Sequence, residues 1–559
     1  MSTEDFPSLD FAQIAFAGHN RPEDLGDDRA ISAGLAAAWA RLAEAGLKEA
    51  RLLSGYAEGA DVIAVETWRS AGLGPVQIVL PYLDAATPDL PEDLYVTATR
   101  LDGAAVRANL RSPHLAQTRW LIGAADLLVV VWNGQAPRGS GGTADAVRLA
   151  LEHGVPVLWF RPGGDGGLRL LRPEFLFEGS GFEELIDQLA SDKAPLVITA
   201  TPQALHAALS DLGLNQPQAE LSASEDAPRL RLAWPWRAYA LFRRVLGGKG
   251  HGLPDAPAPP DLASQPGFVL LTSARATAAR EAQRLGAIHR SKQVILLAIA
   301  IIMAAAGSAP ALWPAAKLPL VSVELVLALL AFFVWIGSER GEHHLRWGSA
   351  RKRAEDLRLE RAAWVVGVST VPHDPISTNT SVARYARRLA ALPQGAFDER
   401  RVQAWGAWVV NELLSRQAAY HRDQAVINGR ISHRVHQAEN VSFAALLALL
   451  ALYIAAAAGF GISGGHPPKW LAGLAVMAGA IVPAIGAAGL ALEATLSLDA
   501  QAHRSLVLRR QLDALRTDLG PEWRLEDLQG VARTAIKLQR AQEDHWSDEA
   551  GRRRLFRGG

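Results

Sequence analysis

The sequence predicts an α/β domain with a doubly wound parallel sheet, followed by an all-α region of four transmembrane helices with long juxtamembrane helices. Two observations predict this division. Up to residue 162, short continuous apolar runs alternate with helix-like stretches, a pattern typical of parallel strands buried between two layers of helices. Beyond residue 290, four apolar segments each have about the 20 residues that a helix needs to cross a hydrocarbon core.

Composition limits the classes of function. The chain has 559 residues, which is long enough for two or three domains. Basic and acidic residues are equal in number, at 57 each, so no overall charge favours nucleic acid. The absence of cysteine excludes disulfides, thiol catalysis and cysteine-ligated metals. The first ten residues are polar and acidic rather than signal-like, so we expect the N-terminal domain to stay in the cytoplasm.

The first domain is predicted over residues 10–162. Its helices are expected at 29–46, 59–72 and 114–125. Five apolar runs are expected to form its strands: QIAFAG (13–18), ARLLSG (50–55), PVQIVLPY (75–82), ADLLVVVW (125–132) and VPVLWF (155–160).

Residues 163–246 are predicted to connect the two halves, with helices near 182–191 and 201–213. The aromatic, basic segment LAWPWRAYALFRRVLGG (232–248) has two interpretations. It lies on a membrane surface, or it packs on the sheet domain. Residues 247–267 are rich in glycine and proline and are predicted to be a linker.

The four predicted spans form two helical hairpins, because the connections within each pair are very short. Arginine and lysine gather at the outer ends of both hairpins, whereas each tight turn holds one lysine, Lys317 or Lys469. This asymmetry predicts a multi-pass protein of the bacterial inner membrane with both termini in the cytoplasm. The spans are expected near 294–313, 318–337, 441–462 and 470–492, within two helix–hairpin–helix units at 268–365 and 366–549.

Three glycine-containing loops are expected to meet where the parallel strands end, at the sheet edge where such folds bind ligands. Two of them open helices, whose N-termini favour phosphate, and glycine lets a phosphate approach the backbone. Glycine also serves tight turns for purely steric reasons, so each loop has this second interpretation. The candidate ligand-binding residues are Gly18, His19, Arg21, Ser54, Gly55, Gly59, Asp61, Asn133, Arg138, Gly141, Gly142, Thr143 and Asp145.

The charged candidates have specific expected roles. Arg21 and Arg138 are expected to pair with phosphate. Asp61 and Asp145 either bind ribose hydroxyls or simply cap and start helices. The histidines of the second half lie among basic residues, so we expect no metal site.

The motifs GHNR, SGYAEGAD and ADLLVVVWNG…GGTADAV…GVPV resemble the SLOG superfamily, a Rossmann-like fold of nucleotide-binding proteins that includes the lonely-guy phosphoribohydrolases. The resemblance implies a nucleotide-like ligand. Lonely-guy enzymes have a catalytic glutamate three positions beyond the threonine of P-G-G-x-G-T-x-x-E. Here that position is Ala146, while Asp145 is displaced and Glu152 lies further along the helix. This departure favours sensing over hydrolysis, with no catalytic residue and no tightly bound cofactor.

The membrane half, about 273–549, is similar to the SLATT family of prokaryotic conflict systems, on the segments AQRLGAIHRSKQ, RWGSARKRAEDLRLE and WVVNELLSRQAAYHRDQAVINGRISHR. The resemblance implies an oligomeric effector that senses a nucleotide signal, made by a separate enzyme or derived from NAD, and permeabilises the membrane in antiviral defence by abortive infection. Two alternatives are a membrane-tethered nucleotide hydrolase using Asp61, Asp145 or Glu152, and a constitutive channel or scaffold.

One acidic residue, Glu324, lies inside the second apolar segment. An ionised side chain within a bilayer is costly unless it is paired or faces water. Glu324 therefore lines a conduit in an oligomer, or its side chain reaches the interface near Lys317.

Overall fold

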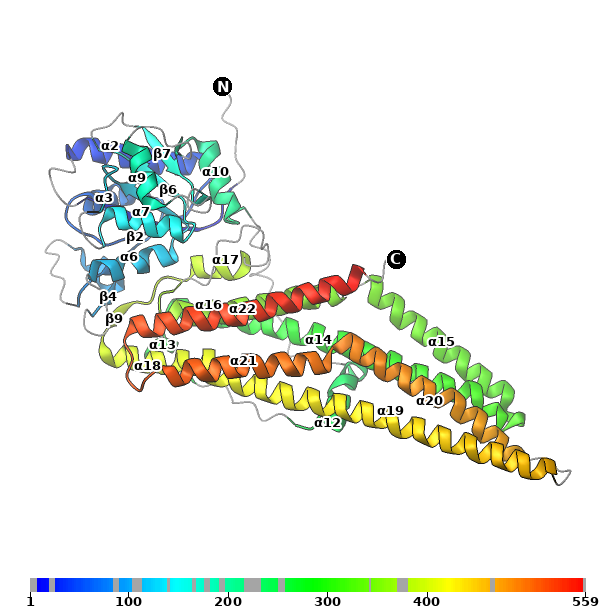
Figure 1. The fold of residues 1–559 in the computed structure, drawn as a ribbon. Helices are drawn as coiled ribbons and strands as arrows, with labels where there is room; N and C mark the ends of the chain where they lie inside the picture. The colour runs from blue at the N-terminus through cyan, green and yellow to red at the C-terminus, as the bar shows by residue number, and fades with distance from the viewer. Residues whose placement is uncertain are drawn as a thin grey trace.

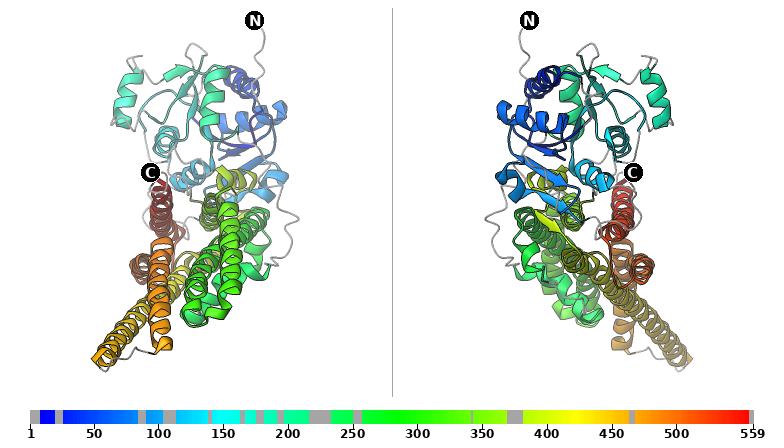
Figure 2. Two further views of the ribbon diagram at one scale, coloured as in Figure 1. Left: turned by 90° about the vertical axis from the view of Figure 1, so that its right-hand side faces the viewer. Right: turned by 90° about the vertical axis from the view of Figure 1, so that its left-hand side faces the viewer.

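The structure is a computed structural model, which describes residues 8–19, 26–83, 90–102, 113–137, 141–162, 167–174, 181–190, 197–215, 233–249, 257–340, 343–368, 381–462 and 468–555. A sheet domain sits at one end of a long helical bundle (Figure 1). Figure 2 shows that the long helices of the bundle extend away from the sheet domain toward the opposite end of the molecule.

The described residues form a nine-stranded sheet in the order β8-β7-β6-β5-β1-β2-β3-β4-β9. All neighbouring pairs from β6 to β9 are parallel, whereas β7 and β8 are antiparallel additions at one edge. The strands are β1 (Ala12–Gly18), β2 (Ala50–Ser54), β3 (Val76–Leu80), β4 (Thr99–Leu101), β5 (Leu127–Val131), β6 (Val157–Phe160), β7 (Leu168–Leu171), β8 (Val197–Thr199) and β9 (Gly395–Phe397).

The predicted fold class is confirmed. All five predicted strands are present as β1, β2, β3, β5 and β6, and their apolar runs are buried because helices cover both faces. Those helices include α2 (Asp28–Glu44), α3 (Ala60–Ala71), α4 (Glu92–Thr97), α6 (Pro113–Ala124), α7 (Thr143–Glu152), α9 (Phe182–Ala190) and α10 (Pro202–Asp211). Part of the predicted connecting region, 163–246, thus completes the sheet domain with β7, α9, β8 and α10.

The opposite edge of the sheet is built from residues far along the chain. Helix α17 (Ser381–Leu389) and strand β9 lie between the two hairpins in sequence, within the unit predicted at 366–549, and β9 pairs with β4. Figure 1 shows α17 between the sheet and the bundle. The side-chain amide of Gln13 in β1 donates to the carbonyl oxygens at the end of α17, at 3.0 Å to Arg387 and 2.9 Å to Arg388. Gln13 thereby satisfies carbonyls that a helix C-terminus leaves without intrahelical partners.

Two very long helices run through the bundle into the apolar part of the structure. Helix α14 (Pro266–Ser308) has 43 residues and α19 (Arg416–Ile462) has 47, so each is about 65–70 Å long. The other α-helices of the bundle, among the described residues, are α12 (Ala238–Leu246), α13 (Pro260–Ala263), α15 (Lys317–Arg340), α16 (His343–Val365), α18 (Glu399–Val410), α20 (Lys469–Leu496), α21 (Leu498–Asp518) and α22 (Leu525–Leu555).

Within the described part of the chain, four helices are long and apolar enough to cross a membrane. They are α14, α15, α19 and α20, and they contain the four predicted segments, except that the first segment continues past Ser308 into a short 3₁₀ turn at Ala309–Ala311. The carboxylate of Glu324 in α15 faces Gly307 of α14, where an added Cβ would lie 3.0 Å from its Oε1 atom. This acidic side chain therefore lies against the partner helix of its own hairpin.

The sheet and the bundle share one hydrophobic core. One face of the sheet packs under α2 and α3, whereas the core of the other face continues into α14, α16, α18 and α22. Aromatic rings bridge the junction: the ring of Trp120 in α6 lies 5.0 Å from Phe397 in β9, and Phe397 lies 5.3 Å from Trp405 in α18. The two halves of the chain are therefore packed together through buried side chains.

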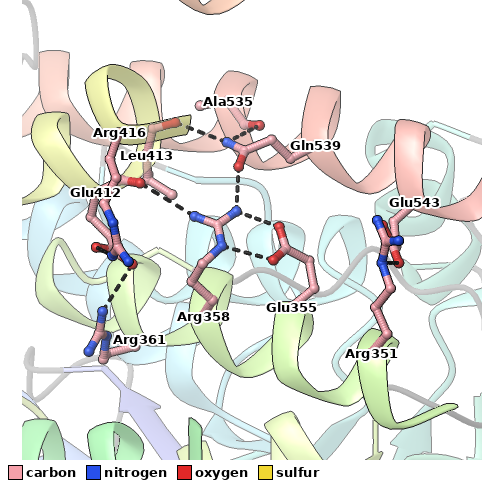
Figure 3. A network of polar contacts seen from close by, with 10 residues as sticks. All are labelled: Arg351, Glu355, Arg358, Arg361, Glu412, Leu413, Arg416, Ala535, Gln539 and Glu543. Atoms are coloured by element: carbon pink, nitrogen blue, oxygen red, sulfur yellow. Dashed lines mark hydrogen bonds and ion pairs between the residues drawn. The ribbon is translucent and has the colours of Figure 1, made fainter. Parts of the chain in front are cut away.

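A buried polar network joins three bundle helices (Figure 3). Arg358 of α16 pairs with Glu355 and donates to the carbonyl oxygen of Glu412 and to the side chain of Gln539 in α22. Glu412 lies in a π-helical turn, Asn411–Ser415, between α18 and α19. A π-turn moves carbonyls out of the usual i→i+4 pattern, and here side chains bond two of them.

Candidate functional site

A pocket of about 350 Å³ opens where the parallel strands end. It lies at the ends of β1 and β5, which are neighbours in the sheet although three strands and more than a hundred residues separate them in the chain. This is the point where the strand order reverses, the position at which open α/β sheets bind ligands. The predicted residues that line the pocket are Gly18, His19, Gly55, Asp61, Asn133, Gly141, Gly142 and Thr143.

The first turns of three helices contribute to the pocket wall. Helix α3 begins after Gly59 and α7 after Gly142, and neither has a side-chain cap. Helix α6 contributes His114 and Gln117. Because helix N-termini present backbone N–H groups and partial positive charge, this arrangement suits an anionic group.

Several of the predicted glycines are required by packing as well. A Cβ on Gly18 would lie 2.4 Å from the Cβ of Ala60, so the glycine lets α3 pack close to β1. Gly141 has φ +86, and its added Cβ would lie 2.5 Å from the backbone nitrogen of Leu115 in α6. Gly142 has an extended backbone at φ −82, which other residues also adopt. The steric interpretation therefore holds for Gly18 and Gly141.

Two of the remaining candidates fix the shape of the loop after β5. The backbone N–H of Asn133 donates to Nε2 of His19 at 3.0 Å, which ties the loop after β1 to the loop after β5. The side-chain oxygen of Asn133 accepts from the backbone N–H of Gln135 at 3.0 Å, a local turn. Both residues thus hold the two loops together at the pocket mouth.

Asp61 is the buried carboxyl of the pocket. Its side chain accepts from the hydroxyl of Ser54 and the backbone N–H of Ala57, each at 3.4 Å. Burial raises the pKa of Asp61 to about 7, against the opposing effect of these hydrogen bonds. The group is therefore poised between its neutral and charged forms near neutral pH. Gly59, the N-cap of α3, adopts φ +91 beside it.

Asp145 acts at the start of α7. It accepts from the backbone N–H of Gly141 at 2.8 Å and pairs with Arg148 at 2.9 Å. These contacts fit the helix-starting interpretation of Asp145. Glu152 lies at the opposite end of α7 from the pocket, where it pairs with Arg148 at 3.2 Å. Arg21 and Arg138, the predicted phosphate partners, lie outside the described residues.

The sequence interpretation missed the contribution of α6. The amide of Gln117 donates to the carbonyl oxygen of Val79 at 2.6 Å and to that of Gly55 at 3.4 Å. Gln117 therefore connects the ends of β3 and β2 to the pocket wall. Gln117 is one of several polar residues in the first half of HLAQTRWLIGAA, so no signal in the sequence singled it out. The ring of Trp132, held by a bond from its Nε1 to the Gln135 carbonyl at 3.0 Å, adds an apolar wall.

No protein-family model, curated protein or solved structure matches this chain. Among the residues that the structure describes, no group of three or more His, Asp or Glu side chains is arranged to hold a metal ion. The site is therefore defined by its own geometry: helix N-termini, a buried carboxyl and an apolar wall at the reversal point of the sheet.

Proposed function

We propose that the pocket binds a phosphate-bearing, nucleotide-like ligand and that binding causes the four apolar helices to permeabilise a membrane. The observation that carries this proposal is the convergence of the first turns of α3, α6 and α7 on one pocket of the sheet. A volume of about 350 Å³ is within the range of small-molecule sites, and Trp132, His114 and Leu121 offer a surface for a base.

Helix α6 supports the second half of the proposal, because it touches both the pocket and the bundle. Its first turn lines the pocket through His114 and Gln117. Further along, Trp120 packs on Phe397 and Arg119 pairs with Glu526 of α22 at 3.3 Å. A ligand that binds more tightly to one position of α6 would favour the corresponding arrangement of the bundle.

The proposal extends to the setting of the protein. The basic residues at the outer ends of both hairpins support an inner-membrane orientation with cytoplasmic termini. Four spans are few for a pore, so the proposal includes assembly of several copies. The resemblance to conflict-system families supports a role in antiviral defence, in which another enzyme makes the signal.

The test is dye release from liposomes containing the full chain, against a panel of cyclic dinucleotides, ADP-ribose derivatives and nucleoside phosphates. We expect one of these compounds to trigger leakage. We expect Gly142→Asp to abolish that leakage, because the carboxylate of the new side chain would occupy the position proposed for the ligand phosphate at the start of α7. Aspartate is favoured at a helix N-cap, so this variant should keep its stability. Gly181→Asp, before α9 and outside the pocket lining, is the matched control.

A triggered leak that persists in Gly142→Asp would place the ligand elsewhere. Inserted protein that never leaks with any compound would contradict the membrane output.

One observation favours a second function, that of a nucleotide hydrolase: the buried carboxyl of Asp61, with its pKa raised to about 7, has the property of a general acid or base. Steady turnover of a panel compound, lost in Asp61→Asn, would establish that function. Ligand binding without turnover would exclude it.

A further inference from the structure

We propose that residues 234–246 form an interfacial helix that lies in the headgroup layer of the cytoplasmic leaflet and binds anionic lipid. The segment consists of a 3₁₀ turn, Trp234–Arg237, followed by α12 (Ala238–Leu246). The inference rests on the membrane-spanning part of the proposed function but not on ligand sensing.

One side of this segment is docked on both hairpins rather than on the sheet domain. The Ser291 hydroxyl of α14 accepts from the backbone N–H of Tyr239 at 3.1 Å and donates to the carbonyl of Trp236 at 2.9 Å. Arg434 of α19 donates to the carbonyl oxygens of Val245 and Leu246. These bonds therefore fix the position of the segment along α14 and α19.

The position of α12 along the bundle coincides with the predicted boundary of the membrane. Ser291 precedes the first predicted span, which begins at Val294, by three residues. Arg434 precedes the third span by seven residues, or about 10 Å of helix. The apolar cluster beneath α12 includes Leu492, the last residue of the fourth span. Three spans thus reach their cytoplasmic ends where α12 is docked.

The other side of the segment exposes large apolar side chains. Trp234 is 83% exposed, Leu241 64% and Val245 62%. Arg237 and Arg244 are exposed among them. A tryptophan with aliphatic and basic neighbours at a membrane boundary is typical of helices that lie in the interface.

Charge identifies the occupant as lipid rather than a second copy. Residues 233–249 hold the basic residues Arg237, Arg243, Arg244 and Lys249 and no acidic residue. The same surface of a second copy would carry the same positive charge and would repel it. Anionic headgroups provide the complementary charge, and acyl chains cover the apolar side chains.

The absence of cysteine makes the test direct. A single cysteine, Leu241→Cys, is labelled with an environment-sensitive fluorophore in the full chain. The protein is reconstituted into vesicles of phosphatidylcholine and phosphatidylglycerol. Two exposed positions calibrate the signal: Val96→Cys, 67% exposed in α4 of the sheet domain, and Leu452→Cys, 58% exposed in the third span.

We expect the Leu241 label to be quenched by a lipid-borne nitroxide and shielded from aqueous iodide. The Val96 label should show the reverse, and the Leu452 label should respond to a deeper nitroxide. Combining Leu241→Cys with Arg237→Gln and Arg244→Gln should lower the shielding, as should vesicles of pure phosphatidylcholine.

A Leu241 label as open to iodide as the Val96 label would overturn the proposal. Shielding from both quenchers that disappears on dilution would assign the surface to a second copy and would also overturn it. Shielding that is unchanged by the arginine substitutions would overturn anionic lipid as the partner. Iodide access at Leu452 would show that the spans do not cross the bilayer. Dye release alone cannot show this, because leakage is absent both when the spans fail to insert and when ligand sensing fails.

Discussion

Asp126 and Arg388 lie 262 residues apart in the sequence and form a buried ion pair, with 2.8 Å between Asp126 Oδ1 and Arg388 Nε. Their side chains are 6% and 2% exposed. The second carboxylate oxygen of Asp126 accepts from the backbone N–H of Gln13 at 3.0 Å. One carboxylate thus connects β1 and the start of β5 to α17, the helix that joins the sheet to the bundle.

Breaking this pair is expected to destabilise the whole chain. Asp126→Ala leaves the Arg388 guanidinium buried without its carboxylate, which should cost about 3–5 kcal/mol of the free energy of unfolding. Thermal unfolding of the purified protein measures the loss. Arg172→Ala, which breaks a pair of similar length (2.9 Å) with both side chains about half exposed, should change stability by only about 0–1 kcal/mol. Equal losses in both variants would contradict a structural role for α17.

The central strands could be predicted because strands buried on both faces leave continuous apolar runs such as LLVVV in β5. The outer strands could not. Strands β4, β8 and β9 have three residues each, too few for a pattern, and β9 joins the sheet from a distant part of the chain. Helix α17 reads as polar in SVARYARRL, yet Arg387 and Arg388 are buried because Glu360 and Asp126 pair with them.

The site likewise has features that the sequence predicts and features that depend on distant parts of the chain. The sequence predicted which loops meet at the sheet edge, because the carboxyl ends of parallel strands share one edge. It left two interpretations for the glycines, and only the backbone could separate them. Gly141 has both a positive φ and a close approach to α6, whereas Gly142 has an extended backbone at φ −82 that other residues also adopt. The role of Gln117 depends on the carbonyl oxygens of Gly55 and Val79, which are distant in the sequence, so no local sequence pattern could predict it.

The pKa of Asp61 leads to a prediction about pH. A carboxyl whose pKa is about 7 in the folded state, above its ordinary 3.8, binds its proton more tightly when folded. Stability should therefore fall as pH rises from about 4 to about 7, by up to about 1.4 kcal/mol per pH unit. Asp61→Asn removes this contribution, so the stability of the variant relative to the natural chain should increase as pH rises from about 4 to about 7 and should level off above pH 7.

The measurement is the difference in Tm between the two proteins at each pH. Burial also raises the pKa of Asp356 in the bundle to about 7, but that effect is common to both proteins and cancels in the difference. A difference in Tm that does not change with pH would show that Asp61 is not a buried carboxyl with a raised pKa. Binding of an anionic ligand should also weaken above pH 7 in the natural chain but not in Asp61→Asn.

Two glycines of α20 should respond in opposite ways to the same substitution. A Cβ on Gly473 would lie 2.7 Å from the backbone oxygen of Ala311, at the turn of the first hairpin, so Gly473→Ala should push the two hairpins apart. Apart from the neighbouring backbone of its own helix, no described atom lies within 4 Å of a Cβ added to Gly479, so Gly479→Ala should stabilise the helix by about 1 kcal/mol. Thermal stability in detergent measures both, and stabilisation by both would show that the hairpins do not touch at their turns.

Arg358 is a central side chain of the polar network around the π-helical turn. It is 4% exposed and reaches Glu355 of its own helix, the carbonyl oxygen of Glu412 in the turn, and Gln539 of α22. The amide of Gln539 in turn donates to the Leu413 carbonyl at 3.1 Å. Side chains of α16 and α22 thus bond two carbonyls of the turn from which α19 begins, as Figure 3 shows.

Arg358→Met should therefore cost about 3–5 kcal/mol, because Glu355 loses its charged partner and the Glu412 carbonyl loses a donor. Arg358→Lys keeps the charge but not the forked geometry, so its cost should be intermediate. Arg509→Met, which removes an exposed i,i+4 pair with Asp513 on α21, should cost less than about 1 kcal/mol. If Arg358→Met unfolds like Arg509→Met, the turn is stable without the network. If it is strongly destabilised while Arg358→Lys is not, then charge alone holds the turn and the bonds to its carbonyl oxygens contribute little.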